Sequence, residues 1–556
     1  MNDSLFTNSF IVFKRNWELI FALLIFVFWG AILIIVVLKK TSKQNFTNHE
    51  LITLALGGWP IPALLISALT LSLRALIPDK ILFVVVTTFI MASAGFAIRA
   101  IWKDMTPGFI FIPAIFLIMT FIRLGFTAGI ILPPYFDSAE HYRIIQFFLN
   151  MQTTSKFAWP TTSYYHVGYH VIAAALAFIT HENISRVMLL FGQIVLAAIP
   201  FPIYFFIHRA VNSHTAALMG IALAAFGWFM PAHAVNWGKY PALLSLLLIQ
   251  FTLGAAVIKD RRVFALSLLA SILIHSRSII VIAVFGIAWM ASHQLRGKRK
   301  LFIALAATLP GMATLLINRN QALGPIFEPY RTWITLLAAL LSASVLLSFP
   351  HLIFFSTLAM LGMLAGTFIP VSAAYTLLDR PLVEMALFLP LAFLGGLGSV
   401  RLSKIAITLF AAIIIFHAFT SHGFSPSECC QLAGRNDVTA VYWMDEQLPT
   451  DARIVIASTD LSIDSFSAPM LGAGTDAGIW IAPLTGRAVT SLPYFTDFLS
   501  QEVYDSLCRQ KATHIYIGSR PQSFKMEFVT ATPARYETIY HVPGVRIVHI
   551  LGCGDS

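Results

Sequence analysis

The sequence VIKDRRVFALSLLASILIHSRSIIVIAVFGIAWMASHQLRGKRK, residues 257–300, holds two apolar runs between two basic clusters. The clusters are Lys259–Arg262 and Arg296–Lys300, and short loops rich in lysine and arginine are typical of the cytoplasmic side of a membrane. If both clusters are cytoplasmic, the chain between them crosses the membrane an even number of times. The stretch therefore predicts a pair of short or re-entrant helices, with the turn His275–Arg277 at their outer tip.

Apolar runs of this kind recur along most of the chain. The protein has 556 residues, of which 58% are hydrophobic and 11% charged. Soluble domains carry about 25% charged residues and disordered chains have low hydrophobicity, so both classes are excluded. We expect a polytopic α-helical membrane protein with about 12–14 spans. The predicted spans are 17–37, 55–77, 81–101, 108–128, 184–207, 214–230, 240–258, 263–275, 277–291, 301–317, 331–348, 351–368, 383–400 and 404–418.

Counting crossings outward from Lys259 orients the rest of the chain. The loops 130–165 and 230–240 and everything after residue 420 should lie outside. The segment 167–181 is only about 15 residues long, which favours an interfacial or re-entrant helix. The same count places the N-terminus outside, although Lys14 and Arg15 precede the first span and would favour the cytoplasm.

Three parts follow from this topology. Residues 1–420 form the predicted transmembrane catalytic domain with an outer loop at 130–183, residues 421–434 a linker, and residues 435–556 a soluble α/β domain. We expect a multi-pass protein of the plasma membrane with an extracytoplasmic C-terminal domain. The net charge of +11 comes from scattered loop residues, which suits anionic lipids and argues against nucleic acid as a partner.

The C-terminal part has the pattern of an α/β domain. Its β-branched runs predict strands at 453–458, 514–518 and 545–551, and its helices are predicted at 438–447 and 495–510. All four cysteines lie after residue 428, which fits an oxidising compartment with disulfides, although free thiols are the alternative. They are Cys429, Cys430, Cys508 and Cys553.

The outer loop 130–183 contains the acidic residues that we single out. Asp137 and Glu140 lie just outside a span, in a body that has few carboxylates. An Asp followed three residues later by Glu is also a helix-capping pattern, here for a helix over 138–149. The chemical interpretation is that Asp137 is a general base whose carboxylate accepts a proton at the membrane surface.

Histidines and aromatic residues follow in the same loop. His166 and His170 share one face of a helix at a spacing of four, so they either bind substrate, hold a divalent metal with the acids, or pack at the interface. The candidate substrate-binding residues of this loop are His141, Tyr165, His166 and His170.

Cations in the other outer loops suggest a phosphate ligand. Lys239 lies on the side where lysine is disfavoured, and Arg277 lies at the tip of the short hairpin, where a planar guanidinium suits phosphate. The structural alternative for Arg277 is snorkelling to the membrane interface. For Asp379 and Arg380 the alternative is a salt bridge between the two. The candidate residues here are Trp237, Lys239, Tyr240, His275, Arg277, Asp379 and Arg380.

The layout resembles the GT-C superfamily of integral-membrane glycosyltransferases. The first outer loop with Asp137 and Glu140 is similar to the acidic loop of that superfamily, and residues 165–170 stand where it often has a juxtamembrane helix that starts with prolines. Those prolines are missing here, and no second acid directly follows Asp137. Residues 478–487 are similar to a turn of the extracytoplasmic domain found in many bacterial members.

The resemblance implies a fold, a reaction and partners. A sugar would move from a polyprenyl-phosphate donor to a hydroxyl of a lipid or glycan acceptor, with inversion. Asp137 would be the base, and Arg277, Arg380 or Lys239 would stabilise the leaving phosphate. A divalent metal is possible in this class and no other cofactor is expected.

Two other classes of protein fit parts of the sequence. A transporter or lipid flippase would have as many spans, but such proteins favour inverted repeats and polar residues at the midplane, and neither is visible here. A scaffold that presents the C-terminal domain is the other alternative. Motifs for nucleotide binding, GxxxxGK[ST] and GxGxxG after a strand, are absent from the sequence.

Overall fold

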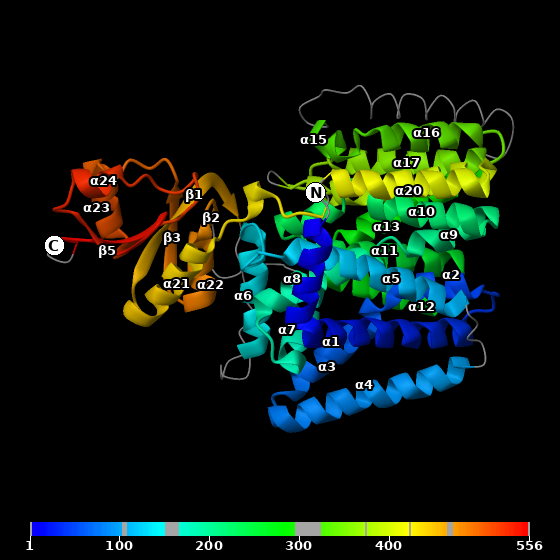
Figure 1. Ribbon diagram of the computed structural model, residues 1–556, viewed down its shortest axis with the longest axis horizontal. Coiled ribbons are helices and arrows are strands. Elements are labelled where there is room, and N and C mark those ends of the chain that lie inside the picture. The colour runs from blue at the N-terminus through cyan, green and yellow to red at the C-terminus, as the bar shows by residue number, and fades with distance from the viewer. Residues whose placement is uncertain are drawn as a thin grey trace.

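The computed structural model describes residues 3–102, 108–150, 166–294, 324–372, 375–421, 424–463 and 471–553. A bundle of long helices lies on one side and a smaller α/β domain, the tail, on the other (Figure 1). We call the bundle end next to the tail the tail side, and the other end the opposite side.

Apolar helices build the bundle, because a bilayer leaves backbone polar groups no partners except those within a helix. Seven described helical segments are long and apolar enough to cross a membrane. They contain α1 (Asp3–Thr41), α2 (Asn48–Gly58) with α3 (Pro60–Leu73), α4 (Asp79–Ile101), α5 (Gly108–Leu124), α8 (Ile184–Ala198) with α9 (Pro202–Val211), α11 (Tyr240–Val257), and α18 (Arg380–Ala386) with α19 (Phe388–Gly398).

Shorter helices complete the bundle and match most of the remaining predicted spans. The polytopic helical fold with a C-terminal α/β domain is therefore confirmed, while the predicted span 301–317 lies outside the described residues. These helices are α10 (His214–Phe226), α12 (Arg261–Ile274), α13 (Ser278–Gln294), α16 (Trp333–Ser344), α17 (Pro350–Gly366) and α20 (Lys404–Thr420).

Contacts between distant segments show which loops share an end of the bundle. On the tail side, the rings of Phe6 and Phe419 are 6.3 Å apart. On the opposite side, Arg209 donates a 2.6 Å hydrogen bond to the carbonyl of Asn45. The beginning of α1 thus lies on the tail side, as the crossing count predicts, in spite of the basic residues there.

Helix α1 is bent, and the bend shapes the tail side. Asn16 has non-helical backbone angles, with φ −128° and ψ 22°. The part of α1 before the bend runs across the ends of its neighbours, and the part after it follows the bundle (Figure 1). Lys14 and Arg15 therefore stand at the tail-side surface of the bundle.

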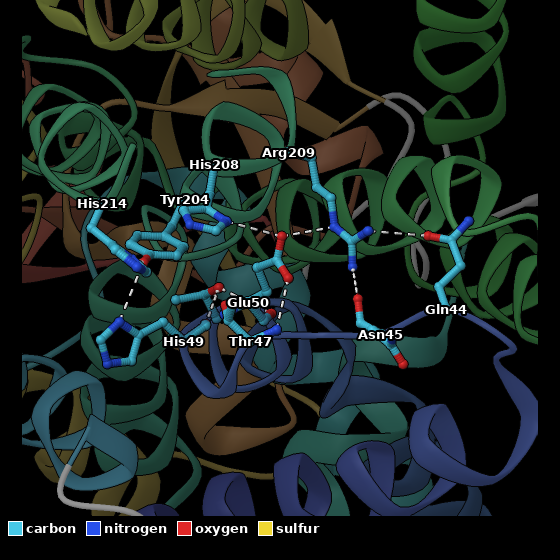
Figure 2. A network of polar contacts seen from close by, with 10 residues as sticks. Gln44, Asn45, Thr47, His49, Glu50, Tyr204, His208, Arg209 and His214 are labelled. Carbon is cyan, nitrogen blue, oxygen red and sulfur yellow. Dashed lines mark hydrogen bonds and ion pairs between the residues drawn. The ribbon is translucent and has the colours of Figure 1, made fainter. Parts of the chain in front are cut away.

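A polar network ties α2 to α9 and α10 on the opposite side (Figure 2). The buried Glu50 carboxylate pairs with Arg209 Nε at 2.7 Å and His208 Nδ1 at 3.0 Å. Its second oxygen accepts from the backbone N–H of Thr47 at 2.9 Å, which completes a capping box for α2. This network clamps three helices at the end away from the tail.

Two helices between the spans do not cross the bundle. These are α6 (Phe136–Asn150) and α7 (Gly168–Thr180). The guanidinium of Arg74, at the tail-side end of α3, lies 4.5 Å from the Phe178 ring and donates to the Leu149 carbonyl at 2.8 Å. Since α7 begins beside α6 and also ends on the tail side, it does not cross the bundle, which is compatible with the interfacial or re-entrant helix expected for 167–181.

The tail is a mixed sheet with helices around it. Strand β1 (Arg453–Ile463) runs parallel to β3 (Ala488–Pro493) and β4 (His514–Ile517), and β4 pairs antiparallel with β6 (Val545–Ile550). The three predicted strands are confirmed. The remaining elements are β2 (Leu471–Gly474), β5 (Tyr536–Val542), α21 (Arg435–Gln447), α22 (Ile481–Thr485), α23 (Gln501–Arg509) and α24 (Glu527–Ala531).

One predicted tail helix is too long. The prediction covered 495–510, but α23 begins at Gln501. The preceding residues form turns, in which Thr496 Oγ1 donates to the Pro493 carbonyl at 2.6 Å and Asp497 Oδ1 accepts from the Leu499 N–H at 3.0 Å. Such local side-chain bonds compete with the helical ladder.

The cysteines divide into one disulfide and two thiols. Cys508 and Cys553 are joined, with their Cα atoms 4.9 Å apart, whereas Cys429 is an exposed thiol and Cys430 a buried one. Of the two alternatives left open by the sequence, a disulfide therefore applies to Cys508 and Cys553, and free thiols to Cys429 and Cys430.

The tail is joined to the tail side of the bundle by direct contacts. The Tyr135 N–H donates to the Cys430 carbonyl at 2.8 Å, and the Ser427 N–H donates to Asn236 Oδ1 at 2.8 Å. The rings of Tyr142 and Trp480 meet edge to face, 5.7 Å apart. The tail thus contacts the same loops that carry the candidate site residues.

Candidate functional site

Asp137 and Lys239 form an ion pair on the tail side. Asp137 lies in the first turn of α6, and Lys239 immediately precedes α11; their side chains are 20% and 28% exposed. Burial opposes the charge of Lys239, but the attraction of Asp137 and then Asp379 outweighs it and raises the pKa of Lys239. Lys239 is thus a cation held beside the candidate base.

The position of Asp137 corrects the capping interpretation. The predicted helix began at Ser138, so Asp137 would have preceded it, but α6 begins at Phe136. Asp137 therefore lies inside the first turn, where a carboxylate is favoured by the helix dipole. Ser138 makes the local bond instead, donating from Oγ to the Pro134 carbonyl at 2.5 Å.

Gly238 lets the segment before α11 approach the start of α6. Its φ is +65°, a left-handed conformation that glycine adopts without strain. A Cβ added at this position would lie 2.5 Å from Ser138 Oγ and 2.9 Å from the Ser138 backbone nitrogen. The absence of a side chain at Gly238 therefore places Lys239 against the start of α6.

A buried histidine pair lies one turn further along α6. His141 Nδ1 and His170 Nε2 are 3.0 Å apart, and the two side chains are 2% and 0% exposed. Burial lowers the pKa of His141 to about 3, so its imidazole is neutral at physiological pH. The pair joins α6 to α7 and offers uncharged imidazoles beside Asp137.

His166, His275, Arg277 and Asp379 form the other half of the site. The rings of His166 and His275 are 4.4 Å apart, and Arg277 pairs with Asp379 at 3.0 Å. Burial and then the charge of Arg277 lower the pKa of His275 to about 3, and burial followed by His275 lowers the pKa of His166. The tip of the predicted hairpin therefore meets the segment that precedes α7.

The two halves are close enough for their charges to interact. Lys239 is affected by both Asp137 and Asp379, and His275 by Lys239. Two carboxylates, two cations and several neutral imidazoles thus share one tail-side region, which we call the polar cluster. Its members are Asp137, His141, His166, His170, Lys239, His275, Arg277 and Asp379.

The other predicted site residues have different surroundings. Glu140 pairs with Arg143 at 3.5 Å along α6, and the Trp237 ring lies 5.2 Å from that of His233. Arg380 is exposed. Asp379 forms its salt bridge with Arg277 and not with Arg380. Tyr165 lies outside the described residues.

An aromatic layer supports the polar cluster and was partly missed from the sequence. Tyr240 stacks on Tyr169 with ring centroids 5.8 Å apart, and Tyr169 stacks on Phe191 at the same separation. A Cβ at Gly192 would lie 2.6 Å from Tyr240, so this glycine makes room for the stack. The Tyr169 ring also contacts His141 and His170, but from the sequence its spacing alone did not distinguish it from ordinary packing.

The described residues provide little support for a metal ion. No three His, Cys, Asp or Glu side chains in the described part of the chain converge to hold one. Asp137 is turned toward Lys239, and His141 and His170 are turned toward each other. A divalent metal therefore stays a prediction, and no step below depends on it.

Comparison with known proteins supports the fold. No protein-family model matches the sequence, and no curated protein matches it. The chain is similar to the cryo-EM structure of the arabinofuranosyltransferase AftD from Mycobacteria, with a TM-score of 0.51 and 11% sequence identity. The match covers 79% of this chain and 40% of AftD, so the chain spans about two fifths of that protein's length.

The fold and the long apolar helices define a membrane protein with the GT-C fold. The resemblance to GT-C glycosyltransferases drawn from the sequence is confirmed at the level of the fold, because AftD is a membrane glycosyltransferase of that class. At this identity the likeness concerns the fold alone, and the activity is a separate question.

Proposed function

We propose that this protein is a membrane glycosyltransferase that moves a sugar from a polyprenyl-phosphate donor to an acceptor hydroxyl, with Asp137 as general base. The observation that carries the proposal is the polar cluster. It brings Asp137 together with Lys239 and Arg277, from loops far apart in the chain, on the side where the tail lies. We propose that this side is extracytoplasmic and that the acceptor is a lipid or a glycan.

The reaction needs a base and a way to stabilise a leaving phosphate. The acceptor O–H gives its proton to the Asp137 carboxylate while its oxygen attacks the anomeric carbon of the donor sugar. The bond from that carbon to the phosphate oxygen breaks on the opposite face, and the polyprenyl phosphate leaves with the bonding electrons. Configuration at the anomeric carbon is inverted.

Lys239 and Arg277 supply the positive charge that the leaving group requires. Each is paired with a carboxylate in the absence of substrate, so neither charge is buried alone. The phosphate of the donor would replace Asp137 as the partner of Lys239, which frees the carboxylate to act as a base. Preorganised charge of this kind is commonly the largest contribution to catalysis.

The neutral histidines suit the recognition of sugar hydroxyls. An uncharged imidazole has one donor and one acceptor nitrogen, so His166 and His275 can bind a hydroxyl in either sense without competing for the phosphate. A protonated ring would instead repel Lys239 and Arg277.

The decisive experiment is Asp137→Asn in the full-length protein, reconstituted with a panel of polyprenyl-phosphate sugars. Asparagine has nearly the same shape but accepts no proton, so we expect transfer to fall by about 100-fold or more, in line with the loss of a general base. The matched control is Asp505→Asn, an exposed carboxylate on α23.

The possible results separate the classes of protein. Full transfer by Asp137→Asn would contradict the role of the base. Failure of the unaltered protein to use any donor of the panel, with lipid movement across vesicles instead, would favour the transporter or flippase.

A further inference from the structure

A second hollow on the tail side lies apart from the polar cluster. It encloses about 700 Å³ between the bent start of α1, the loop 127–132, the beginning of α8 and the tail helix α21. None of the polar-cluster residues lines it. We call it the junction pocket, because the bundle and the tail both contribute walls.

The polar lining of the junction pocket is positively charged. Arg15, Arg186 and Arg435 come from the bundle and from the tail, and no carboxylate is among the described residues that line it. Arg186 pairs with Glu182 outside the lining at 2.9 Å. The side chains of Arg15 and Arg435 form no ion pair or hydrogen bond with the part of the chain that the structure describes.

A buried hydroxyl also lacks a partner in this pocket. Ser185 is 5% exposed, lies in the first turn of α8, and its Oγ has no hydrogen-bond partner among the described residues. Leaving such a group unsatisfied is unfavourable, so a ligand that accepts its hydrogen bond would be favoured. The N-terminal end of α8 adds a dipole that attracts anions.

The rest of the lining mixes neutral polar residues, such as Asn8 and Asn183, with apolar residues that continue onto the surface of the bundle. Ile11 and Ile131 line the pocket. Ile11 is 54% exposed. Two aromatic residues of the same helix, Phe10 and Trp17, are 59% and 50% exposed. Exposed aromatic and aliphatic residues at the end of a membrane helix are typical of the membrane interface. A ligand of this pocket would therefore touch arginines with one end and hydrocarbon with the other.

We propose that the junction pocket binds the phosphate headgroup of an anionic lipid, with Arg15, Arg186 and Arg435 as the phosphate partners. The proposal explains why Arg15 lies on the tail side, where the proposed orientation would disfavour a cation. It goes beyond the transferase function and does not depend on it, because its evidence and its test concern binding alone.

The test is lipid retention by the full-length protein in phosphatidylcholine nanodiscs, measured by native mass spectrometry with phosphatidic acid as the probe. We expect preferential retention of phosphatidic acid over phosphatidylcholine. The triple variant Arg15→Gln, Arg186→Gln and Arg435→Gln should lose the preference, by about fivefold for each arginine. The control variant Arg99→Gln, Arg261→Gln and Arg509→Gln has the same change in charge on exposed residues outside the pocket and should retain it.

A milder change guards against misfolding. Arg435→Glu reverses the charge of an exposed tail residue, and Arg509→Glu does the same elsewhere in the tail. We expect only the first to weaken retention, with unchanged melting temperatures for both. Equal retention by pocket and control variants, or no preference in the unaltered protein, would overturn the proposal.

Inorganic phosphate distinguishes a lipid from a free anion. It lacks the hydrocarbon that would contact the Ile11 surface, so we expect it to compete at least about tenfold more weakly than a short-chain phosphatidic acid. Equal competition by the two would overturn the assignment to a lipid and indicate a site for free phosphate.

Discussion

Asp137 and Lys239 are 102 positions apart in the chain, yet their side chains meet at the tail side of the bundle. Each charge is only partly exposed, so each depends on the other for its stability in this position. The pair holds the candidate base in place before substrate arrives, which is compatible with catalysis only if a substrate phosphate can replace the carboxylate at Lys239.

Gly238 gives the sharpest test of this geometry at the scale of one residue. We expect Gly238→Ala to lower sugar transfer by about 100-fold, because the new Cβ would push Lys239 and Ser138 apart by a fraction of an ångström to an ångström. The matched control is Gly129→Ala, since Gly129 also has a positive φ, +81°, but a Cβ there would meet nothing within 4 Å. The measurement is the initial transfer rate of each variant. Gly238→Ala adds both a clash and backbone strain, whereas Gly129→Ala adds the strain alone. Equal rates would contradict the role of Gly238.

The buried histidines predict a loss of stability in acid. The pKa of His141 and of His275 is about 3 in the folded protein, whereas an unfolded histidine titrates near about 6.5. Between these values the unfolded chain binds more protons, so stability falls as the pH is lowered, by about 1.4 kcal/mol per pH unit for each histidine.

Melting temperatures from pH 7 to pH 4 measure this effect. His141→Asn should show a shallower decline than the unaltered protein, whereas His541→Asn, at an exposed position of the tail, should not. An identical slope for His141→Asn would show that His141 takes up its proton in the folded state.

At the scale of elements, the opposite-side network joins helices that the sequence does not connect directly. Glu50 lies in the first turn of α2, whereas its partners His208 and Arg209 lie in the last turn of α9. Tyr204 adds a second contact, because its hydroxyl is 3.3 Å from His49 Nδ1 and also meets His214 at the start of α10 (Figure 2). The clamp keeps α2, α9 and α10 together at the end of the bundle far from the polar cluster.

Glu50→Gln should weaken this clamp. Glutamine keeps the size of the side chain but removes the negative charge beside Arg209. Arg209 is partly exposed and also bonds Asn45, so we expect a cost near that of one hydrogen bond to a charged group, about 1.5–3 kcal/mol. We expect a lower melting temperature for the purified protein. Glu18→Gln, at an exposed position of α1, is the control and should melt as the unaltered protein does. A Glu50→Gln protein of unchanged stability would mean that the network carries no net stabilisation.

At the scale of the whole molecule, the tail and the polar cluster lie at the same end of the bundle. The linker meets this end through Asn236 and Tyr135, and the tail meets it through Trp480. Every part of the proposed function therefore depends on which side of the membrane this end faces.

Cys429 offers a direct measurement of that orientation. It is an exposed thiol at the linker, while Cys430 is buried and the other two cysteines are joined. We expect a membrane-impermeant maleimide to label intact cells at Cys429, and Cys429→Ser to remove the label. Arg261→Cys in that background, on the opposite side, should label only after the cells are opened. The reverse pattern would place the tail in the cytoplasm.

Much of the fold could be predicted from local sequence. Whether a stretch such as 240–258 crosses a membrane depends on the transfer free energy of its own side chains, and this is readable without neighbours. The crossing count then placed the start of α1 on the tail side, although Lys14 and Arg15 alone suggested otherwise. The tail strands were visible for the same local reason, whereas the start of α23 depended on turn bonds around Pro493 and Asp497.

The candidate site divides in the same way. Asp137, Lys239 and Arg277 could each be chosen because a charge next to a membrane span is costly and needs a reason. Their partners could not be chosen. The pairing of Arg277 with Asp379, the exposure of Arg380, and the disulfide between Cys508 and Cys553 all depend on which segments pack side by side. Packing of that kind joins residues without regard to their separation in the chain. The sequence alone therefore determined the spans and the polar residues at their ends, and the tertiary structure decided which of those residues meet.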